Sequence, residues 1–121
     1  LSIDQGDRIL TFLDGGHNHP WPAFDLLVLR DILPHDSWVI MQDVQMMERW
    51  IADCVVYGVP SPHPVRGVNL AYSLWPGTKM TGFGLCYNTS SVKMDVSDDQ
   101  LRAFARSMND YANEIEFGFL Y

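Results

Sequence analysis

The order of apolar and polar positions predicts two short strands that are joined by one helix. Residues 9–13 are apolar or β-branched throughout and end at Asp14, whereas residues 38–41 are apolar throughout and end shortly before Asp43. Between the two runs, residues 23–33 carry apolar side chains at close to helical spacing. Strands that are apolar at every position and bridged by a helix are typical of a parallel pair buried on both faces. The opposite face of the predicted helix is polar, with Asp25, Arg30 and Asp31.

The pattern predicts further elements along the rest of the chain. Helical spacing recurs over residues 44–55 and 68–75, and residues 59–67 between them form a loop with three prolines. Gly82 and Gly84 inside the strand predicted over residues 78–88 indicate a tight hairpin or a bulge, with residues 89–94 as a second arm. Ser97 predicts the N-cap of a closing amphipathic helix. The element order β α β α α β β α predicts an α/β fold. We expect a mostly parallel sheet with helices on both faces and an antiparallel hairpin at one edge.

Composition places the chain among folded globular domains and excludes some classes of binding partner. The 121 residues suffice for one domain, and 47% hydrophobic with 19% charged residues is typical of a folded protein. A net charge of −7 argues against binding nucleic acid or an anionic membrane surface through a basic field. No apolar run approaches the ~20 residues that a membrane span needs. The two cysteines are far apart and are expected to be reduced thiols, which predicts a cytoplasmic protein.

Asp14 and Asp43 are the first candidates for a functional site. In open α/β sheets, ligands bind beyond the carboxyl ends of the strands, so both aspartates are expected to face one crevice. Gln42, directly before Asp43, would add an amide oxygen to that crevice. An alternative interpretation is that each aspartate caps the loop or helix that follows it.

The segment FLDGGHNHPWPAFDLLVLRDILPHDSWVIMQDV resembles the second half of a class I S-adenosylmethionine-dependent methyltransferase. The likeness is closest to the small-molecule O-methyltransferase branch, whose fourth strand ends in a D-G-x-H pattern, matched here by Asp14, Gly15 and His17. The residues Q-D at 42–43 stand where that branch carries an acidic pair, and P-H-D at 34–36 stands where it carries a P-G-G turn. The later segments RGVNLAYSLW and TKMTGFGLCYN resemble the helix before the sixth strand and the sixth and seventh strands of that fold.

The resemblance implies a Rossmann-like methyltransferase fold, of which residues 1–121 form a single, partial domain that corresponds to the C-terminal half. It implies transfer of a methyl group from S-adenosylmethionine to a hydroxyl of a small molecule. Asp14, Asp43 and Gln42 would hold a divalent ion such as Mg²⁺. Asp14 and His17 would be catalytic, with His17 as the general base. The sequence has no G-x-G-x-x-G cofactor loop, so the chain would lack most of the cofactor pocket.

Histidines and one tryptophan near these motifs have competing interpretations. Trp21 lies beside the D-G-x-H segment and would either stack on a flat substrate or serve as a half-buried anchor. His63, in the proline loop, would either cover the crevice and contact substrate or be solvated. His17 and His19 also form a His-x-His pair of the kind that ligates zinc in hydrolases, although they equally suit a polar loop.

A second hypothesis is that the chain has no catalytic function. The chain would then be a small α/β module that associates with a partner or with another copy of itself. The apolar tail at residues 117–121 and an open sheet edge would favour such association.

Overall fold

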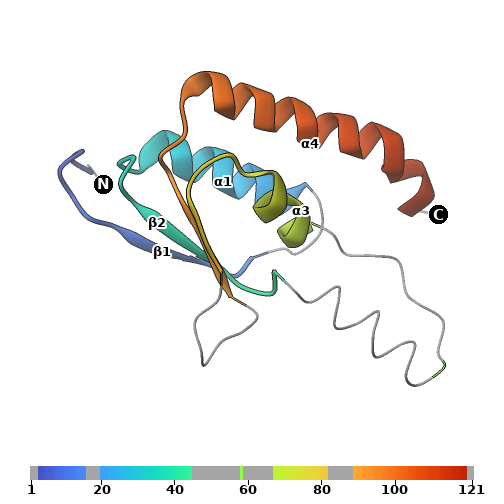
Figure 1. The fold of residues 1–121 in the computed structure, drawn as a ribbon, viewed down its shortest axis with the longest axis horizontal. Coiled ribbons are helices and arrows are strands. Elements are labelled where there is room, and N and C mark those ends of the chain that lie inside the picture. The colour runs from blue at the N-terminus through green and yellow to red at the C-terminus, as the bar shows by residue number, and fades with distance from the viewer. Residues whose placement is uncertain (1–2, 16–19, 45–57, 59–66, 82–88, 120–121) are drawn as a thin grey trace.

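A computed structural model of the chain describes residues 3–15, 20–44, 58, 67–81 and 89–119. Within these residues the order of elements is strand, helix, strand, helix, strand, strand, helix (Figure 1). The elements are β1 (Leu10–Leu13), α1 (Trp21–Ile32), β2 (Trp38–Met41), α3 (Gly67–Leu74), β3 (Lys79–Thr81), β4 (Ser90–Lys93) and α4 (Asp98–Phe119). Residues 45–55 of the helix predicted over residues 44–55, and residues 59–66 of the proline loop predicted over residues 59–67, lie outside the described residues.

Proline chemistry sets both ends of α1. Pro20 occupies the N-cap position, and Pro22 lies in the first turn, where a missing backbone N–H costs nothing. Leu33 is already extended, with ψ 149°, as expected for a residue that precedes proline. The helix predicted for residues 23–33 is therefore confirmed, with its start two residues earlier, at Trp21.

The strands form one mixed sheet in the order β1-β2-β4-β3. The parallel pairing of β1 with β2 is confirmed, with Phe12 opposite Ile40. The antiparallel hairpin β3–β4 is also confirmed, but β4 lies inside the sheet between β2 and β3, and it runs antiparallel to both. The predicted mostly parallel sheet is thus corrected to a mixed one. A short connection between β3 and β4 can only return the chain antiparallel, and β4 takes the place beside β2.

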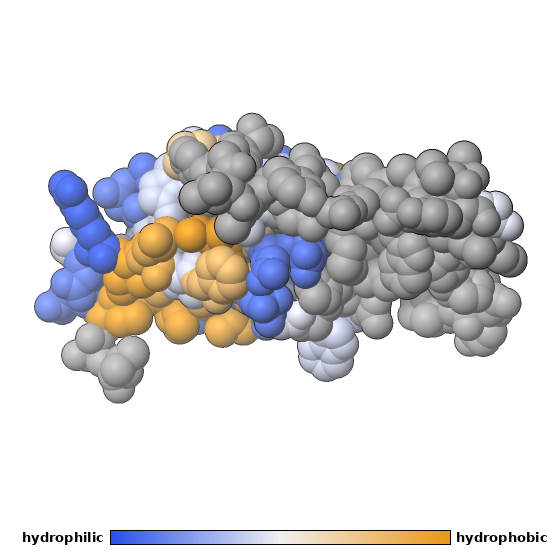
Figure 2. Space-filling view, turned by 90° about the horizontal axis from the view of Figure 1, so that it is seen from below, coloured by the Kyte–Doolittle hydropathy of each residue, from blue (hydrophilic) through white to orange (hydrophobic). Residues whose placement is uncertain are grey.

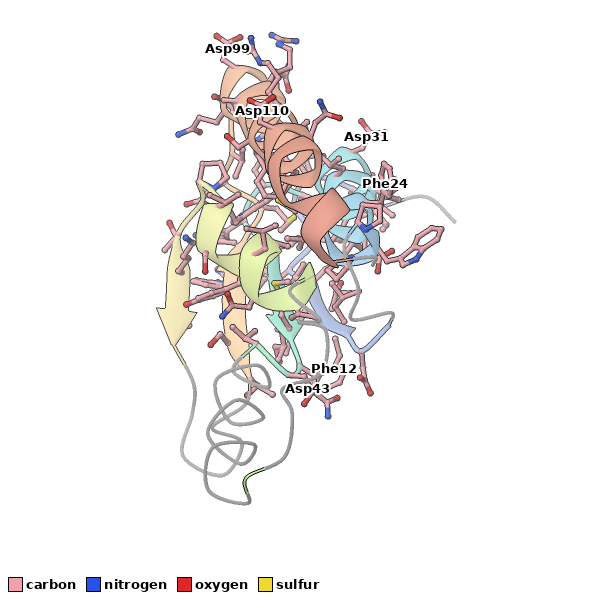
Figure 3. The ribbon with its side chains drawn as sticks, turned by 90° about the vertical axis from the view of Figure 1, so that its right-hand side faces the viewer. Phe12, Phe24, Asp31, Asp43, Asp99 and Asp110 are labelled. Carbon is pink, nitrogen blue, oxygen red and sulfur yellow. The ribbon has the colours of Figure 1, made fainter. Side chains whose placement is uncertain are left out.

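The three described helices, α1, α3 and α4, lie together on one side of the sheet (Figures 1 and 3). We predicted helices on both faces of the sheet. Among the described residues this is corrected, because the second face of the sheet carries no helix. Crossovers from β1 to β2 and from β2 to β3 advance in one direction across the sheet. Right-handed crossovers that advance in one direction place their helices on the same face.

The core lies between the helices and the covered face of the sheet. Leu26 of α1 and the strand residues Val39, Met41 and Val92 are fully buried there. Trp75, which is 1% exposed, packs edge-on against Phe104 of α4 with ring centroids 5.1 Å apart. Its indole Nε1 donates a hydrogen bond of 2.9 Å to the carbonyl oxygen of Lys93. One side chain therefore joins the end of α3, strand β4 and α4.

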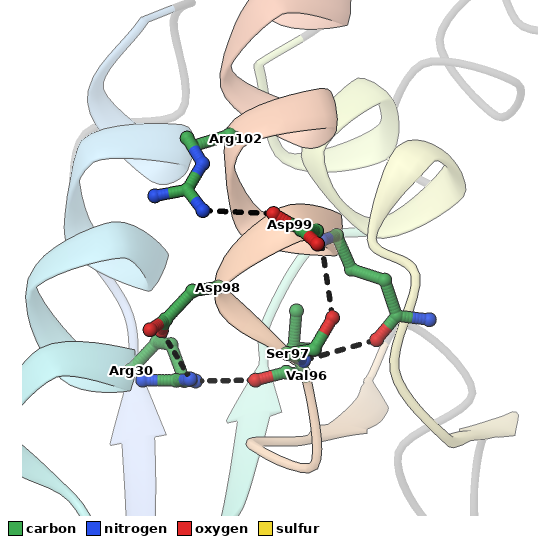
Figure 4. A network of polar contacts seen from close by, with 7 residues as sticks. Arg30, Val96, Ser97, Asp98, Asp99 and Arg102 are labelled. Atoms are coloured by element: carbon green, nitrogen blue, oxygen red, sulfur yellow. Dashed lines mark hydrogen bonds and ion pairs between the residues drawn. The ribbon is translucent and has the colours of Figure 1, made fainter.

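Arg30 joins α1 to the start of α4 (Figure 4). Its Nε donates to the carbonyl oxygen of Val96 at 2.7 Å, and its Nη2 lies 3.1 Å from Asp98 Oδ1. The helical pattern placed Arg30 on the exposed polar face, and this prediction is wrong because Arg30 is buried. Its hydrogen-bond partner, the Val96 carbonyl, is distant in sequence and could not be inferred from local periodicity.

The start of α4 confirms the predicted cap at Ser97. Ser97 Oγ accepts a 3.2 Å hydrogen bond from the backbone N–H of Gln100, whose side-chain Oε1 accepts one of 3.0 Å from the Ser97 N–H. This reciprocal pair is a capping box. Asp98 and Asp99 lie in the first turn, where the helix dipole favours negative charge. The helix continues into the predicted apolar tail, whose side chains are not described.

Asp95, shortly after β4, contacts Thr78, directly before β3, and so links the two strands at this end of the pair. It accepts hydrogen bonds from the Thr78 backbone N–H, at 2.9 Å, and from the Thr78 hydroxyl. Burial alone would raise the pKa of Asp95, but these hydrogen bonds outweigh burial, so the pKa lies below its usual value. A Cβ atom at Gly77 would lie 2.5 Å from the carbonyl oxygen of Lys93, so only glycine fits this turn.

None of the helices in the described ranges has the length and apolar character needed to cross a membrane.

Candidate functional site

Asp14 and Gln42 meet at the carboxyl ends of the parallel strands β1 and β2. The backbone N–H of Gln42 donates to the carbonyl oxygen of Leu13 at 3.2 Å, which fixes the two strand ends side by side. In the amide orientation that satisfies both side chains, Gln42 Nε2 donates to Asp14 Oδ2 at 2.9 Å and to Oδ1 at 3.1 Å. The predicted convergence of Asp14 and Gln42 is therefore present in the structure.

Asp43 turns the chain out of β2 through an unusual backbone conformation. Its φ is 62°, in the left-handed region that side chains other than glycine, asparagine and aspartate rarely adopt. Figure 3 shows Asp43 at the same end of the sheet as Phe12 of β1. Asp43 is half-buried, and the carbonyl of the next residue, Val44, accepts a 3.2 Å hydrogen bond from Asn69 Nδ2 of α3. Helix α3 thus holds the segment that carries Asp43, a role that the sequence did not indicate for Asn69.

The backbone of Asp43 leads to a stability prediction that compares two substitutions. Asp43→Gly and Asp43→Ala both remove the carboxylate, but only glycine adopts φ 62° without a steric cost. We expect Asp43→Gly to be more stable than Asp43→Ala by about 1 kcal/mol. Urea denaturation of the two variants measures this difference. Equal stabilities would contradict the left-handed conformation.

Gly15, which directly follows Asp14, lies beside the Asp25 side chain of α1. A Cβ atom at Gly15 would be 3.4 Å from Asp25 Oδ2, so the Asp25 carboxylate adjoins the glycine that follows Asp14. The helical pattern placed Asp25 on the exposed face, whereas the structure makes it half-buried. Asp25 is therefore an acid beside the residue that follows Asp14, and periodicity did not identify this position. One signal in the sequence could have indicated this position. Asp25 lies three residues after Pro22, in the first turns of the helix that follows the D-G-x-H motif.

Trp21 is the first residue of α1 and is 60% exposed. Its ring contacts Phe24 at 6.3 Å between centroids, with the planes tilted by 55°. The exposed ring is free of the core, so the interpretation as a half-buried anchor is wrong, while substrate stacking stays a prediction. His17, His19 and His63 lie outside the described residues, and their predicted roles also stay predictions.

The oxygen atoms at the strand ends are of the type that binds a hard cation such as Mg²⁺. Asp14 and Asp43 offer carboxylate oxygens, which Mg²⁺ prefers, usually from one or two carboxylates with water completing the shell. Gln42 would have to turn its amide so that the oxygen replaces the nitrogen that now faces Asp14. Among the described residues, no group of three or more histidine, cysteine or acidic side chains could hold a metal ion. Any cation here would therefore rely on water or substrate for its remaining ligands.

Comparison with known proteins returned no match: no family model, no curated protein and no solved structure resembles the chain closely enough to match. The site at Asp14 and Gln42 and the arrangement of the elements around it are therefore the basis for assigning a function.

Proposed function

We propose that the chain is the C-terminal half of an S-adenosylmethionine-dependent O-methyltransferase domain that transfers a methyl group to a hydroxyl of a small molecule. The observation that carries the proposal is the pairing of Asp14 with Gln42 beyond the carboxyl ends of two parallel strands. Ligands of open α/β sheets bind at this edge, and the D-G-x-H motif begins at Asp14.

The sequence of elements supports the same proposal. A parallel pair joined by a helix, then a helix and an antiparallel pair, is the arrangement expected for the end of a Rossmann-like methyltransferase fold. Residues 1–121 would form a single, partial domain of that fold. The glycine-rich cofactor loop would belong to a part of the domain that this sequence does not contain. With no basic field and a net charge of −7, a small molecule is a better acceptor than nucleic acid. We also propose that the protein is located in the cytoplasm.

The chain's own residues would prepare the acceptor hydroxyl. His17, three residues after Asp14 in the sequence, would take the hydroxyl proton on an imidazole nitrogen, because its ordinary pKa of about 6.5 suits neutral pH. Asp14, which the Gln42 amide nitrogen holds when no cation is bound, would orient the acceptor hydroxyl beside that base. S-adenosylmethionine, when bound, would supply the methyl group that the acceptor oxygen receives.

A divalent cation and two side chains would assist. Asp14 and Asp43, with Gln42 after rotation of its amide, would hold Mg²⁺, and the ion would lower the pKa of the acceptor hydroxyl. Trp21, whose ring is exposed, would stack on a flat acceptor. His63, in the proline-containing segment of residues 59–67, would also contact the acceptor.

The proposed cation site predicts a charge-dependent response at Gln42. Gln42→Glu replaces the donor that faces Asp14 with a second carboxylate, so two like charges lie about 3 Å apart and destabilise the fold. We expect Mg²⁺ to raise the melting temperature of Gln42→Glu more than that of the wild type. Thermal denaturation with and without Mg²⁺ measures this, with Gln5→Glu on the exposed lead-in segment as the matched control. An equal response of Gln42→Glu and Gln5→Glu would exclude the cation site.

Calorimetric titration of S-adenosylmethionine tests the proposed function. A longer polypeptide that includes the sequence upstream of Leu1 is expected to bind the cofactor, and the 121-residue chain alone is expected to bind it weakly or not at all. The comparison separates a partial site from a complete one. Absence of binding to the longer polypeptide would refute the cofactor assignment, and tight binding to the 121-residue chain would refute its alignment with the C-terminal half.

A second candidate function is association without catalysis, and one observation favours it. Leu10 and Phe12 of β1 are 68% and 58% exposed at the edge of the sheet, where apolar side chains invite a partner.

A further inference from the structure

Asp43 is the residue of the proposed cation site whose backbone is left-handed. Its φ of 62° is unfavourable for an aspartate unless neighbouring residues hold it there. The residue before it, Gln42, is fixed because its backbone N–H donates to the Leu13 carbonyl oxygen at 3.2 Å. The conformation of Asp43 therefore depends on what fixes the residue after it, Val44.

Two contacts fix Val44. Its side chain is buried in the hydrophobic core, and its carbonyl oxygen accepts a hydrogen bond of 3.2 Å from Nδ2 of Asn69 in α3. A hydrogen bond of this kind shifts a conformational equilibrium by about 2- to 10-fold. The preference of a residue other than glycine against the left-handed region is of similar size, about 5- to 30-fold. The Asn69 contact is thus strong enough to influence which conformation Asp43 adopts.

Core packing sets the place of Asn69. It lies in α3 between Val68 and Leu70, both of which are buried, and Ala71 in the next position is fully buried. Helix α3 also packs against α1 and α4. These contacts do not involve the Asn69 amide, so removal of the amide should leave α3 in place. The hydrogen bond to Val44 can therefore be tested by substitution of this one side chain.

The Asn69 contact comes from the side of the sheet that the described helices cover. Figure 2 shows the opposite side, seen from below, with a hydrophobic patch. Leu10 and Phe12 of β1 are exposed on that face, so the prediction that this strand is buried on both faces is wrong for the described residues. In the proposed domain, the missing half would cover this face. The contact between Asn69 and Val44 lies within the chain itself and does not depend on that cover.

We propose that Asn69 is a positioning residue, which holds Asp43 in its left-handed conformation through the Val44 carbonyl and so sets the direction of the Asp43 carboxylate in the cation site. The inference rests on the proposed function, because it takes Asp14 and Asp43 as the acids that hold the cation. It assigns a role at that site to α3, an element that contains none of the other proposed site residues.

A double-mutant cycle in urea tests the backbone part of the proposal without any ligand. The folding equilibrium constant of Asp43→Gly should exceed that of Asp43→Ala by about 5-fold, because glycine adopts the left-handed conformation without cost. When Asn69→Ala is added to both variants, residue 43 can leave that conformation, and the ratio should fall below about 2-fold. Asn69→Asp, which keeps the shape of the side chain and lacks the donor, should lower the ratio in the same way. A ratio that stays near 5-fold would overturn the proposal, since the packing of Val44 alone would then hold Asp43.

Calorimetric titration with Mg²⁺ tests the functional part. Asn69→Ala should raise the Kd of the 121-residue chain for Mg²⁺ by about 3- to 10-fold. In the Asp43→Gly background, which has no carboxylate at this position, Asn69→Ala should leave the residual Kd unchanged. A merely structural role of Asn69 would raise the Kd equally in both backgrounds. Asn109→Ala, exposed on α4, is the matched control and should leave the Kd unchanged.

The outcomes separate this inference from the proposed methyl transfer. An equal rise of the Kd with and without the Asp43 carboxylate, or no rise at all, would overturn the assignment of Asn69 to the site. A wild-type chain that does not bind Mg²⁺ would overturn both the cation site and the role of Asn69 in it. Binding of S-adenosylmethionine to the longer polypeptide is measured independently, so each of these failures is distinct from failure of the cofactor assignment.

Discussion

Asp14→Asn is expected to lower kcat/KM for methyl transfer by about 10²–10⁴-fold, the range over which a positioned acid–base group contributes. Asparagine keeps the shape of the side chain and one oxygen for the Gln42 amide, so the strand ends at Leu13 and Gln42 should stay paired. The loss would then reflect the missing negative charge beside the acceptor hydroxyl. Steady-state kinetics of the longer polypeptide, with S-adenosylmethionine and a hydroxylated acceptor, measures the effect.

Asp31→Asn is the matched control for this substitution. Asp31 is exposed on α1 (Figure 3), and its isosteric replacement removes the same charge from the molecule. We expect kcat/KM of Asp31→Asn to equal that of the wild type. A similar loss in both variants would mean that overall charge, and not the site at Asp14, governs the rate. An Asp14→Asn variant with full activity would remove Asp14 from the catalytic site.

Trp75→Ala is expected to destabilise the fold by about 3–5 kcal/mol, as truncation of a buried aromatic side chain does. The substitution removes the ring that packs on Phe104 and leaves the Lys93 carbonyl without the indole hydrogen bond of 2.9 Å. The cavity would lie where α3, β4 and α4 meet. The free energy of unfolding, measured by urea denaturation, gives the magnitude.

Trp21→Ala is the natural comparison, since Trp21 is 60% exposed and Trp75 is 1% exposed. We expect the Trp21 variant to lose less than about 1 kcal/mol, as surface substitutions generally do. Trp75→Phe should fall between the two because it keeps part of the ring contact and loses the hydrogen bond. Equal costs at positions 21 and 75 would contradict the packing described for Trp75.

Local patterns were sufficient to predict the part of the fold that carries the site. The apolar runs before Asp14 and Gln42, with a helix between them, predicted a parallel pair, and β1 and β2 form that pair. Geometry then required both strand ends to lie on one edge of the sheet, and the Asp14–Gln42 contact follows from it. Ser97 was predicted as a cap because its hydroxyl suits that position, and it forms the capping box with Gln100.

Long-range packing was not predictable in the same way. An apolar run indicates that a strand can be buried, but it does not say which face is covered, so the exposure of Phe12 was missed. Arg30 is polar in a helical pattern, yet it is buried, and it pairs with the Val96 carbonyl and with Asp98. The position of β4 between β2 and β3 depends on pairing across distant segments. Each of these features depends on contacts between residues far apart in the chain, which periodicity does not encode.

Transfer of a labelled methyl group tests the proposed function most directly. The longer polypeptide is incubated with S-adenosylmethionine labelled on its methyl group, with Mg²⁺ and with a panel of small hydroxylated molecules. We predict that the label appears as an ether on a hydroxyl oxygen of at least one acceptor, and that Asp14→Asn lowers its rate of appearance by about 10²-fold or more. Failure of the folded, cofactor-bound polypeptide to label any acceptor, or labelling that is unchanged in Asp14→Asn, would contradict a methyl-transfer site at Asp14 and Gln42.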